Sequence, residues 1–120
     1  MKKSIMKKWI TALKSGKYKQ TRGTLKGKRG YCCLGVLCDI HDDTKWTQDV
    51  CGFNGYGNGL EEGGLTNTVK KWAGVNTTNG DVDGMIIRNG DSLSLVHLND
   101  KRHWGFKKIA KFIEKNYKKI

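Results

Sequence analysis

The sequence predicts an α+β protein that forms one small domain over residues 1–120. Two amphipathic helices are expected, one near each end of the chain, because apolar side chains recur there every three or four residues. Between them, an alternating segment is typical of a strand, and one short apolar stretch is suited to burial. A chain of 120 residues with 37% hydrophobic residues can bury a modest core. We therefore expect both helices to pack with a small sheet around a buried central element.

The first expected helix covers residues 3–15 and ends before Gly16, because glycine commonly follows the last turn of a helix. Lysines occupy positions between its apolar side chains, so the outer face of the helix should be basic. The apolar positions with helical spacing are Ile5, Trp9, Ala12 and Leu13.

Residues 17–26 follow a pattern of period two, which is typical of a strand. A strand would place Tyr18, Gln20 and Arg22 on one face. There, a phenol ring could stack on a base, an amide could recognise the polar edge of that base, and a guanidinium could bind a phosphate. This face is our first candidate nucleotide site, and an ordinary exposed strand face is the alternative. The candidate residues are Lys17, Tyr18, Lys19, Gln20 and Arg22.

The most apolar stretch of the chain covers residues 31–40. Its small and aliphatic side chains favour a buried helix, and a buried strand stays open because the run is short. Its three cysteines should be buried thiols, since their spacing fits no usual zinc motif. Further along, we expect a glycine-rich loop over 52–64, a short helix over 67–73 that ends at Gly74 with Trp72 packed inward, and a strand over 84–90.

The last expected helix covers residues 106–117, where apolar side chains recur over four turns. The turn before it contains Asn99 and Asp100, either of which could cap the helix. Because a helix N-terminus attracts anions, the same turn is our second candidate wall of a ligand pocket. The residues of that wall are Asn99, Asp100, Arg102, His103 and Trp104.

Charge is segregated along the chain. Residues 1–30 carry a net charge of +11 without any acid, residues 31–100 carry −6, and residues 101–120 carry +7. Two basic ends around an acidic middle create a local positive field that concentrates anions, so we expect a phosphate-bearing partner. A solvated lysine surface without a ligand is the alternative.

Several classes of function find little support in the sequence. No apolar run approaches the length of about 18 residues that a membrane span needs, and no secretory signal is evident, so we expect a cytoplasmic protein without membrane contact. The acidic run over 39–43 and the calcium-like run over 79–84 lack a complete ligand set, so we expect no metal and no other cofactor. The three histidines have no sequence cue that joins them to a nucleophile.

Three blocks of the sequence have a distinctive pattern: Trp9-x-x-Ala-Leu-Lys-Ser-Gly-Lys-Tyr-Lys-Gln20, Tyr31-Cys-Cys-Leu-Gly-Val-Leu-Cys-Asp39, and Leu95-x-x-Leu-Asn-Asp100 followed by Phe106-x-x-Ile-Ala110. Together they resemble a widespread group of small phage and prophage proteins. Accessory phage proteins of this size often counter host defence, and several act as homo-oligomeric sponges for nucleotide immune signals. The resemblance thus implies an anti-defence role in the infected bacterial cell. Within the blocks, the polar positions expected to bind the ligand are Tyr18, Gln20, Asp39, Asn99 and Asp100.

The leading hypothesis is a homo-oligomeric binding protein that sequesters a nucleotide-derived signal, such as a cyclic ADP-ribose or a cyclic dinucleotide. The first alternative is a phosphodiesterase that cleaves such a signal with His41, His97 or His103. The second is a nucleic-acid-binding protein, because the net charge of +12 also suits a phosphate backbone. A protein that docks on an acidic host partner would use the same surface.

Overall fold

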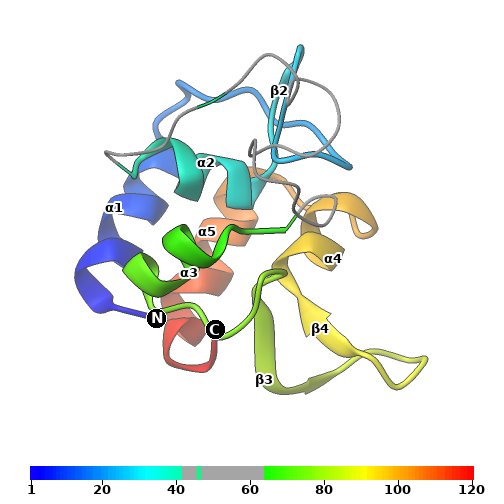
Figure 1. Cartoon of the computed structure of the whole chain (residues 1–120). Coiled ribbons are helices and arrows are strands. Elements are labelled where there is room, and N and C mark those ends of the chain that lie inside the picture. Colours follow the sequence, from blue (N-terminus) through cyan, green and yellow to red (C-terminus); the bar gives the residue numbers. More distant parts are fainter. Residues whose placement is uncertain (42–45, 47–63) are drawn as a thin grey trace.

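Helices enclose one core, and two small antiparallel sheets lie at its edges (Figure 1). The computed structural model describes residues 1–41, 46 and 64–120. It confirms the predicted α+β class. The helices are α1 (Lys3–Lys14), α2 (Cys33–Asp39), α3 (Asn67–Ala73), α4 (Leu95–Asp100) and α5 (Phe106–Asn116), followed by the 3-10 turn η2 (Tyr117–Lys119). The strands are β1 (Lys26–Gly27), β2 (Gly30–Tyr31), β3 (Asp81–Ile86) and β4 (Ser92–Ser94).

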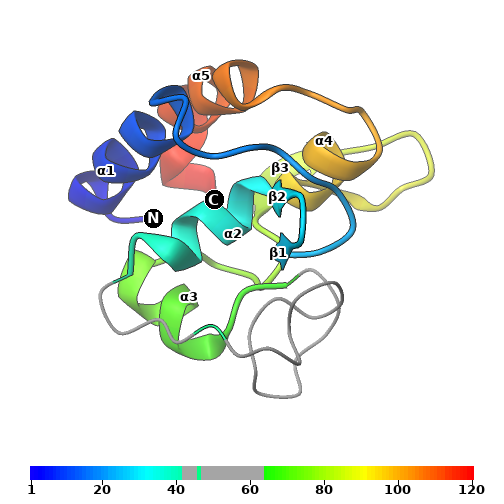
Figure 2. The same ribbon diagram turned by 90° about the horizontal axis from the view of Figure 1, so that it is seen from above.

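Helix α2 is the buried central element, so the apolar stretch forms a helix and not a strand. Every residue from Cys33 to Cys38 is buried. The Cys32 side chain caps the helix by accepting a hydrogen bond from the N–H of Gly35, at 3.3 Å. A Cβ on Gly35 would clash with the backbone carbonyl of Leu25, so glycine lets the helix approach that segment closely. Figure 2 shows α2 in the middle of the molecule, between α1 and the hairpin β1–β2.

Helices α1 and α5 pack side by side, and both follow the predicted apolar spacing. The amino group of Met1 donates hydrogen bonds to the carbonyls of Tyr117, at 2.8 Å, and Ile120, at 3.3 Å. The start of α1 therefore lies at the end of α5, and Figure 1 shows the two chain ends together. Trp9 is fully buried and its indole N–H donates to the carbonyl of Cys33 at 2.9 Å, which joins α1 to α2.

The predicted strand over 17–26 is wrong. Apart from Lys26, where β1 begins, the segment forms no strand and makes an isolated parallel bridge between Gln20 and Tyr31. Two hydrogen bonds hold this bridge. The N–H of Thr21 donates to the carbonyl of Tyr31, and the N–H of Tyr31 donates to the carbonyl of Lys19, each at 2.8 Å. Because β2 is only two residues long, it provides too short an edge for a strand of ten residues.

The later elements follow the sequence prediction with shifted bounds. Helix α3 covers the expected residues and ends at Gly74, whose φ of 70° suits glycine. Trp72 is only half-buried and packs its ring against the edge of His41. The strand expected over 84–90 instead runs over β3, because residues 87–90 turn back toward β4. The glycine-rich loop expected over 52–64 lies almost wholly outside the described residues.

Three cysteines, Cys32, Cys33 and Cys38, are buried, as the sequence predicts. Burial raises the pKa of the Cys32 thiol to about 12 and the pKa values of the other two well above their usual range. These thiols are therefore protonated core residues near neutral pH. Within the described residues, no helix combines the length and the apolar character that a bilayer crossing requires.

Candidate functional site

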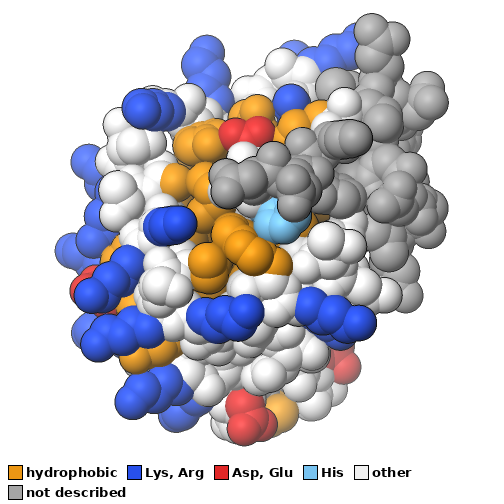
Figure 3. All heavy atoms as spheres, turned by 60° about the vertical axis from the view of Figure 1, so that its left-hand side comes forward, with side chains coloured by type: hydrophobic (Ala, Val, Ile, Leu, Met, Phe, Trp, Pro, Cys, Tyr) orange, Lys and Arg blue, Asp and Glu red, His pale blue; other side chains and the backbone are white. Residues whose placement is uncertain are grey.

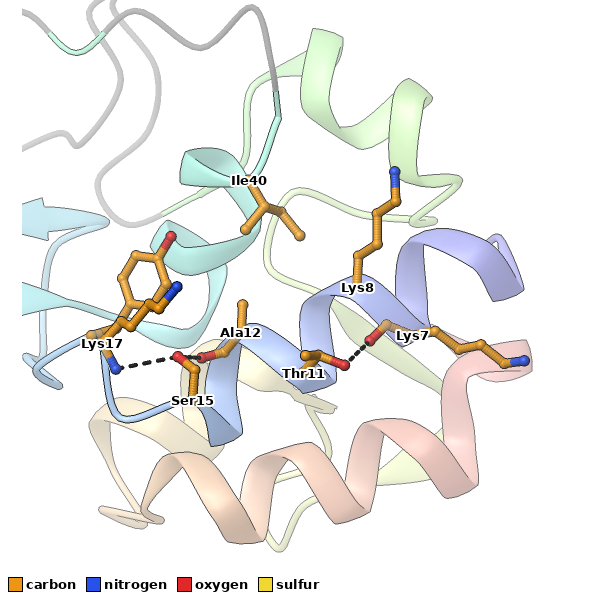
Figure 4. Close-up of a pocket in the computed structure, with 8 residues that line it drawn as sticks. Lys7, Lys8, Thr11, Ala12, Ser15, Lys17 and Ile40 are labelled. Carbon is orange, nitrogen blue, oxygen red and sulfur yellow. Dashed lines mark hydrogen bonds between the residues drawn. The ribbon is translucent and has the colours of Figure 1, made fainter.

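A cavity of about 490 Å3 opens between α1 and the C-terminal end of α2. Figure 4 shows Lys8 and Lys17 on opposite sides of it, with Ile40 facing Ala12 across the opening. Its wall combines ammonium groups with aliphatic and aromatic surface, which is the composition that a ligand with anionic and apolar parts requires. The lining residues are Lys7, Lys8, Thr11, Ala12, Ser15, Lys17, Tyr18 and Ile40.

The helical spacing of α1 explains one wall of this cavity. Lys8, Ala12 and Ser15 are separated by four and then three residues, so they share one flank of the helix. The small side chains of Ala12 and Ser15 leave space where longer ones would fill it. The Ser15 hydroxyl donates to the carbonyl of Ala12 at 2.7 Å and accepts from the N–H of Lys17 at 3.2 Å. These bonds fold the chain back after the helix and return Lys17 to the cavity.

Tyr18 forms an aromatic part of the wall, and its orientation is held by Asp39. The phenol donates a 2.7 Å hydrogen bond to Oδ2 of Asp39, and the indole N–H of Trp46 donates to Oδ1 at 2.9 Å. The Tyr18 ring also contacts Tyr31 edge-on, with ring centroids 5.0 Å apart. Burial and the bond to Asp39 raise the pKa of Tyr18, so the phenol stays protonated. Asp39 is therefore a positioning residue for the ring.

The cavity has a positive rim. Among the lining side chains that the structure describes, three are lysines and none is a carboxylate. Figure 3, which brings the α1 side of the molecule forward, shows hydrophobic side chains that reach the surface, with Lys and Arg on several sides of them and an acidic side chain at one edge. An anion entering this site would meet positive charge beside a surface that is partly shielded from water, where electrostatic attraction is stronger than in bulk solvent.

A second group of predicted site residues forms a buried hydrogen-bond network around Asn99, which is fully buried. Its Oδ1 accepts from Nε2 of Gln20 at 2.7 Å and from the N–H of Cys33 at 3.2 Å. Its Nδ2 donates to the carbonyl of Thr21 at 2.9 Å and to Oδ1 of Asp100 at 2.7 Å. All four hydrogen-bonding positions of this amide are thus used within the protein.

Neighbouring residues extend this network. Gln20 also donates to the carbonyl of Trp104 at 2.8 Å, and Nε of Arg22 donates to the carbonyl of Asn99 at 3.1 Å. Tyr18 bonds Asp39 while Gln20 and Arg22 bond around Asn99, so the three side chains do not form the common ligand face that a strand would have given them. Lys19 contributes its carbonyl to the contact with β2, and its side chain is exposed.

The residues of the second predicted pocket wall, 99–104, do not form the N-terminal cap of α5. Asn99 and Asp100 lie in the last turn of α4, and the N-cap of α5 is Gly105 without a side-chain cap. Arg102 and His103 are exposed in the connection between α4 and α5. His103 has a φ of 54°, a left-handed conformation that suits a tight connection. Trp104 packs against Phe112 of α5.

The histidines lie in three separate places. His41 is buried beside Trp72, His97 is half-buried in α4, and His103 is exposed. Within the described residues, no group of three or more His, Cys, Asp and Glu side chains could hold a metal ion. The cavity wall, as far as it is described, contains neither a histidine nor a carboxylate.

Of the predicted site residues, the structure places only Lys17 and Tyr18 at the cavity. The prediction missed Lys7, Lys8 and Ile40. The flank formed by Lys8, Ala12 and Ser15 could have been found from helical spacing, because small residues between basic ones mark a possible hollow. Ile40 could not, since its approach to α1 depends on tertiary packing.

The comparisons with known proteins support a family assignment. A family model described as a domain of unknown function (DUF8296) matches residues 1–117. The comparisons with curated proteins and with solved structures found no match. Because the family model covers nearly the whole chain, this protein belongs to the DUF8296 family.

Proposed function

We propose that this protein binds and sequesters a nucleotide-derived signalling molecule in the cavity between α1 and α2. The carrying observation is the combination of Lys7, Lys8 and Lys17 with the aromatic and aliphatic surface of Tyr18 and Ile40 in one cavity. The lysines would hold phosphates, and the apolar surface would contact a base or a ribose. In the phage setting that the sequence resemblance suggests, this cytoplasmic homo-oligomer would remove an immune signal of the infected bacterium.

The size of the cavity supports a ligand of the cyclic ADP-ribose or cyclic dinucleotide class. Its volume of about 490 Å3 lies within the range of about 300–1,000 Å3 that is usual for small-molecule sites. Such ligands carry two phosphates, which three ammonium groups can neutralise. Lysine is a compact point charge on a flexible stem, so these residues can adapt to phosphates at different positions on a ring.

The chemistry of the wall favours binding over cleavage. A phosphodiesterase needs a group that accepts or donates a proton near neutral pH, or a metal ion that activates water. The described lining residues offer hydroxyl and ammonium groups only, and the raised pKa of Tyr18 removes its phenolate as a base. Sequestration needs none of this chemistry, only affinity.

Isothermal titration with cyclic ADP-ribose isomers and cyclic dinucleotides tests the proposal. The variant K8Q/K17Q removes two cavity charges, and the matched control K28Q/K71Q removes two exposed charges elsewhere. We expect one ligand of the panel to bind the wild type and the control equally, and to bind K8Q/K17Q at least about tenfold more weakly. Ala12→Leu, which fills the cavity, should also abolish binding. Equal affinity for wild type, K8Q/K17Q and Ala12→Leu would overturn the proposal.

A further inference from the structure

Helix α5 carries a second basic surface, which lies away from the cavity wall. Its buried side is formed by Phe106, Ile109, Ala110 and Ile113, and lysines occupy the opposite side at spacings of three and four residues. All of these lysines are exposed. We call this surface the α5 lysine face; its members are Lys107, Lys108, Lys111, Lys115, Lys118 and Lys119.

Helix α1 extends the α5 lysine face. The two helices run side by side in opposite directions (Figures 1 and 4), with the amino group of Met1 bonded to the end of α5. Lys3 and Lys14, near opposite ends of α1, are also exposed. Exposed lysines are therefore present on both of these packed helices. The cavity, by contrast, lies between α1 and the end of α2.

Several charges on α5 are unfavourable for the isolated helix, although Glu114 lies at favourable spacings from Lys111 and Lys118. Lys111 and Lys115 are four residues apart, and like charges at this spacing repel each other. Lys107 and Lys108 lie in the first turn, where the positive end of the helix dipole favours an acid. Within the part of the chain that the structure describes, none of these lysines forms an ion pair with a carboxylate. An external polyanion would relieve this repulsion.

An aromatic side chain lies at one end of the α5 lysine face. The ammonium group of Lys108 lies 4.2 Å from the centroid of the Trp104 ring, and Trp104 is half-buried. Basic rows beside a partly exposed aromatic ring suit nucleic acids, because phosphates bind the lysines and an unpaired base can take the place of the Lys108 ammonium on the ring. An acidic protein would complement the charge, but its binding would not require an aromatic ring at this position.

From this charge pattern, we propose that the α5 lysine face binds the sugar–phosphate backbone of nucleic acid, independently of base sequence. This activity is separate from ligand binding in the cavity. The lysines supply the affinity by releasing counterions from the phosphates, and Trp104 adds a preference for single strands.

Fluorescence anisotropy with a labelled 20-nucleotide single strand and the matching duplex tests this inference over a series of salt concentrations. The variant K111Q/K115Q/K118Q removes three charges from the face without touching the cavity wall or Trp104. The control K28Q/R29Q/K71Q removes the same charge from other exposed positions. Glutamine and lysine have similar helix propensities, so both variants should fold.

We expect the face variant to bind at least about tenfold more weakly than the wild type, and its slope of log affinity against log salt to be smaller by about 2 to 3. The control should keep most of the wild-type affinity, and Ala12→Leu should bind nucleic acid normally even if it no longer binds a nucleotide. Equal losses in the face variant and the control would show that only net charge matters and would overturn the inference. So would the absence of binding to both strands at low salt, which would favour an acidic protein partner.

Discussion

The side-chain oxygen of Asn99, in the last turn of α4, accepts the backbone N–H of Cys33, in the first turn of α2, at 3.2 Å. One buried amide therefore joins the end of one helix to the beginning of another that precedes it by 66 positions. The same amide holds Gln20 and the carbonyl of Thr21, so three distant segments meet at this residue.

Replacing Asn99 should destabilise the protein strongly. Asn99→Leu would leave several buried partners unsatisfied, and Asn99→Asp would place a carboxylate against the carbonyl of Thr21 and the carboxylate of Asp100. We expect each change to lower the free energy of unfolding by about 3 kcal/mol or more. Urea denaturation measures the change, with the exposed Asn76→Asp as a control that should remain within about 0.5 kcal/mol of the wild type. A similar small effect at Asn99 would contradict the central role of this network.

Gly35→Ala should also be severely destabilising, although alanine normally favours a helix. Its Cβ would clash with the carbonyl of Leu25, so α2 would have to move away from that segment. We expect a loss of about 3 kcal/mol, at the upper end of the usual cost of overpacking. Thermal unfolding followed by circular dichroism measures it. Gly90→Ala is a useful comparison: no atom lies within 4 Å of its Cβ position, so its cost should come only from its φ of 92°.

The buried thiols predict a loss of stability at alkaline pH. The pKa values of Cys32, Cys33 and Cys38 are raised in the folded protein, so unfolded thiols ionise near pH 9 while folded ones remain protonated. Their contribution is present below pH 9 and is lost as pH rises through the folded pKa, about 12 for Cys32. Together, the three thiols should lower the free energy of unfolding at pH 10 by about 4 kcal/mol relative to pH 7. Urea denaturation from pH 7 to pH 10 tests this dependence.

The control for the alkaline effect is the variant Cys38→Ala. Its loss of unfolding free energy between pH 7 and pH 10 should be smaller than that of the wild type by about 1 kcal/mol. A thiol-specific reagent gives a second readout. Under native conditions these three cysteines should not react, because burial suppresses the reactive thiolate. Rapid modification of Cys32 or Cys33 in the folded protein would contradict their assignment as core residues.

Two variants of Tyr18 distinguish the contribution of its aromatic ring from that of its hydroxyl group. Tyr18→Phe keeps the ring but loses the hydrogen bond to Asp39, so it should cost about 1 kcal/mol in stability and change ligand affinity by less than about threefold. Tyr18→Ala removes the aromatic wall and should weaken binding by about tenfold or more. Calorimetric titration of both variants measures these changes in ligand affinity. Equal affinities for the wild type and Tyr18→Ala would mean that the ring does not contact the ligand.

The parts of the fold that depend on local spacing could be predicted from the sequence. Trp9 and Leu13 in α1, and Ile109 and Ile113 in α5, repeat at the period of a helix and are buried as that period requires. The segment around Gln20 could not be predicted in the same way, because a strand needs a partner edge. That edge lies at Tyr31 and is too short, which no local pattern reveals.

The candidate site was predicted only in part for a related reason. The sequence predicts that Gln20 and Asn99 bind a ligand, because they are polar positions in apolar blocks, but the amide of Gln20 donates to that of Asn99 at 2.7 Å across 79 positions. Local reasoning could not tell a polar group that awaits a ligand from one whose partner is distant in the sequence. The basic character of α1 is evident from its sequence, whereas the cavity also needs Ile40, which tertiary packing brings beside that helix.

The most direct test of the central claim is native mass spectrometry of the protein incubated with the nucleotide panel, followed by denaturation and chromatography of the released small molecule. We predict that one nucleotide binds with a fixed stoichiometry to a homo-oligomer and is released chemically unchanged, and that Ala12→Leu retains none. Release of a cleaved nucleotide would contradict sequestration and indicate an enzyme. Identical retention by Ala12→Leu would contradict the cavity as the binding site.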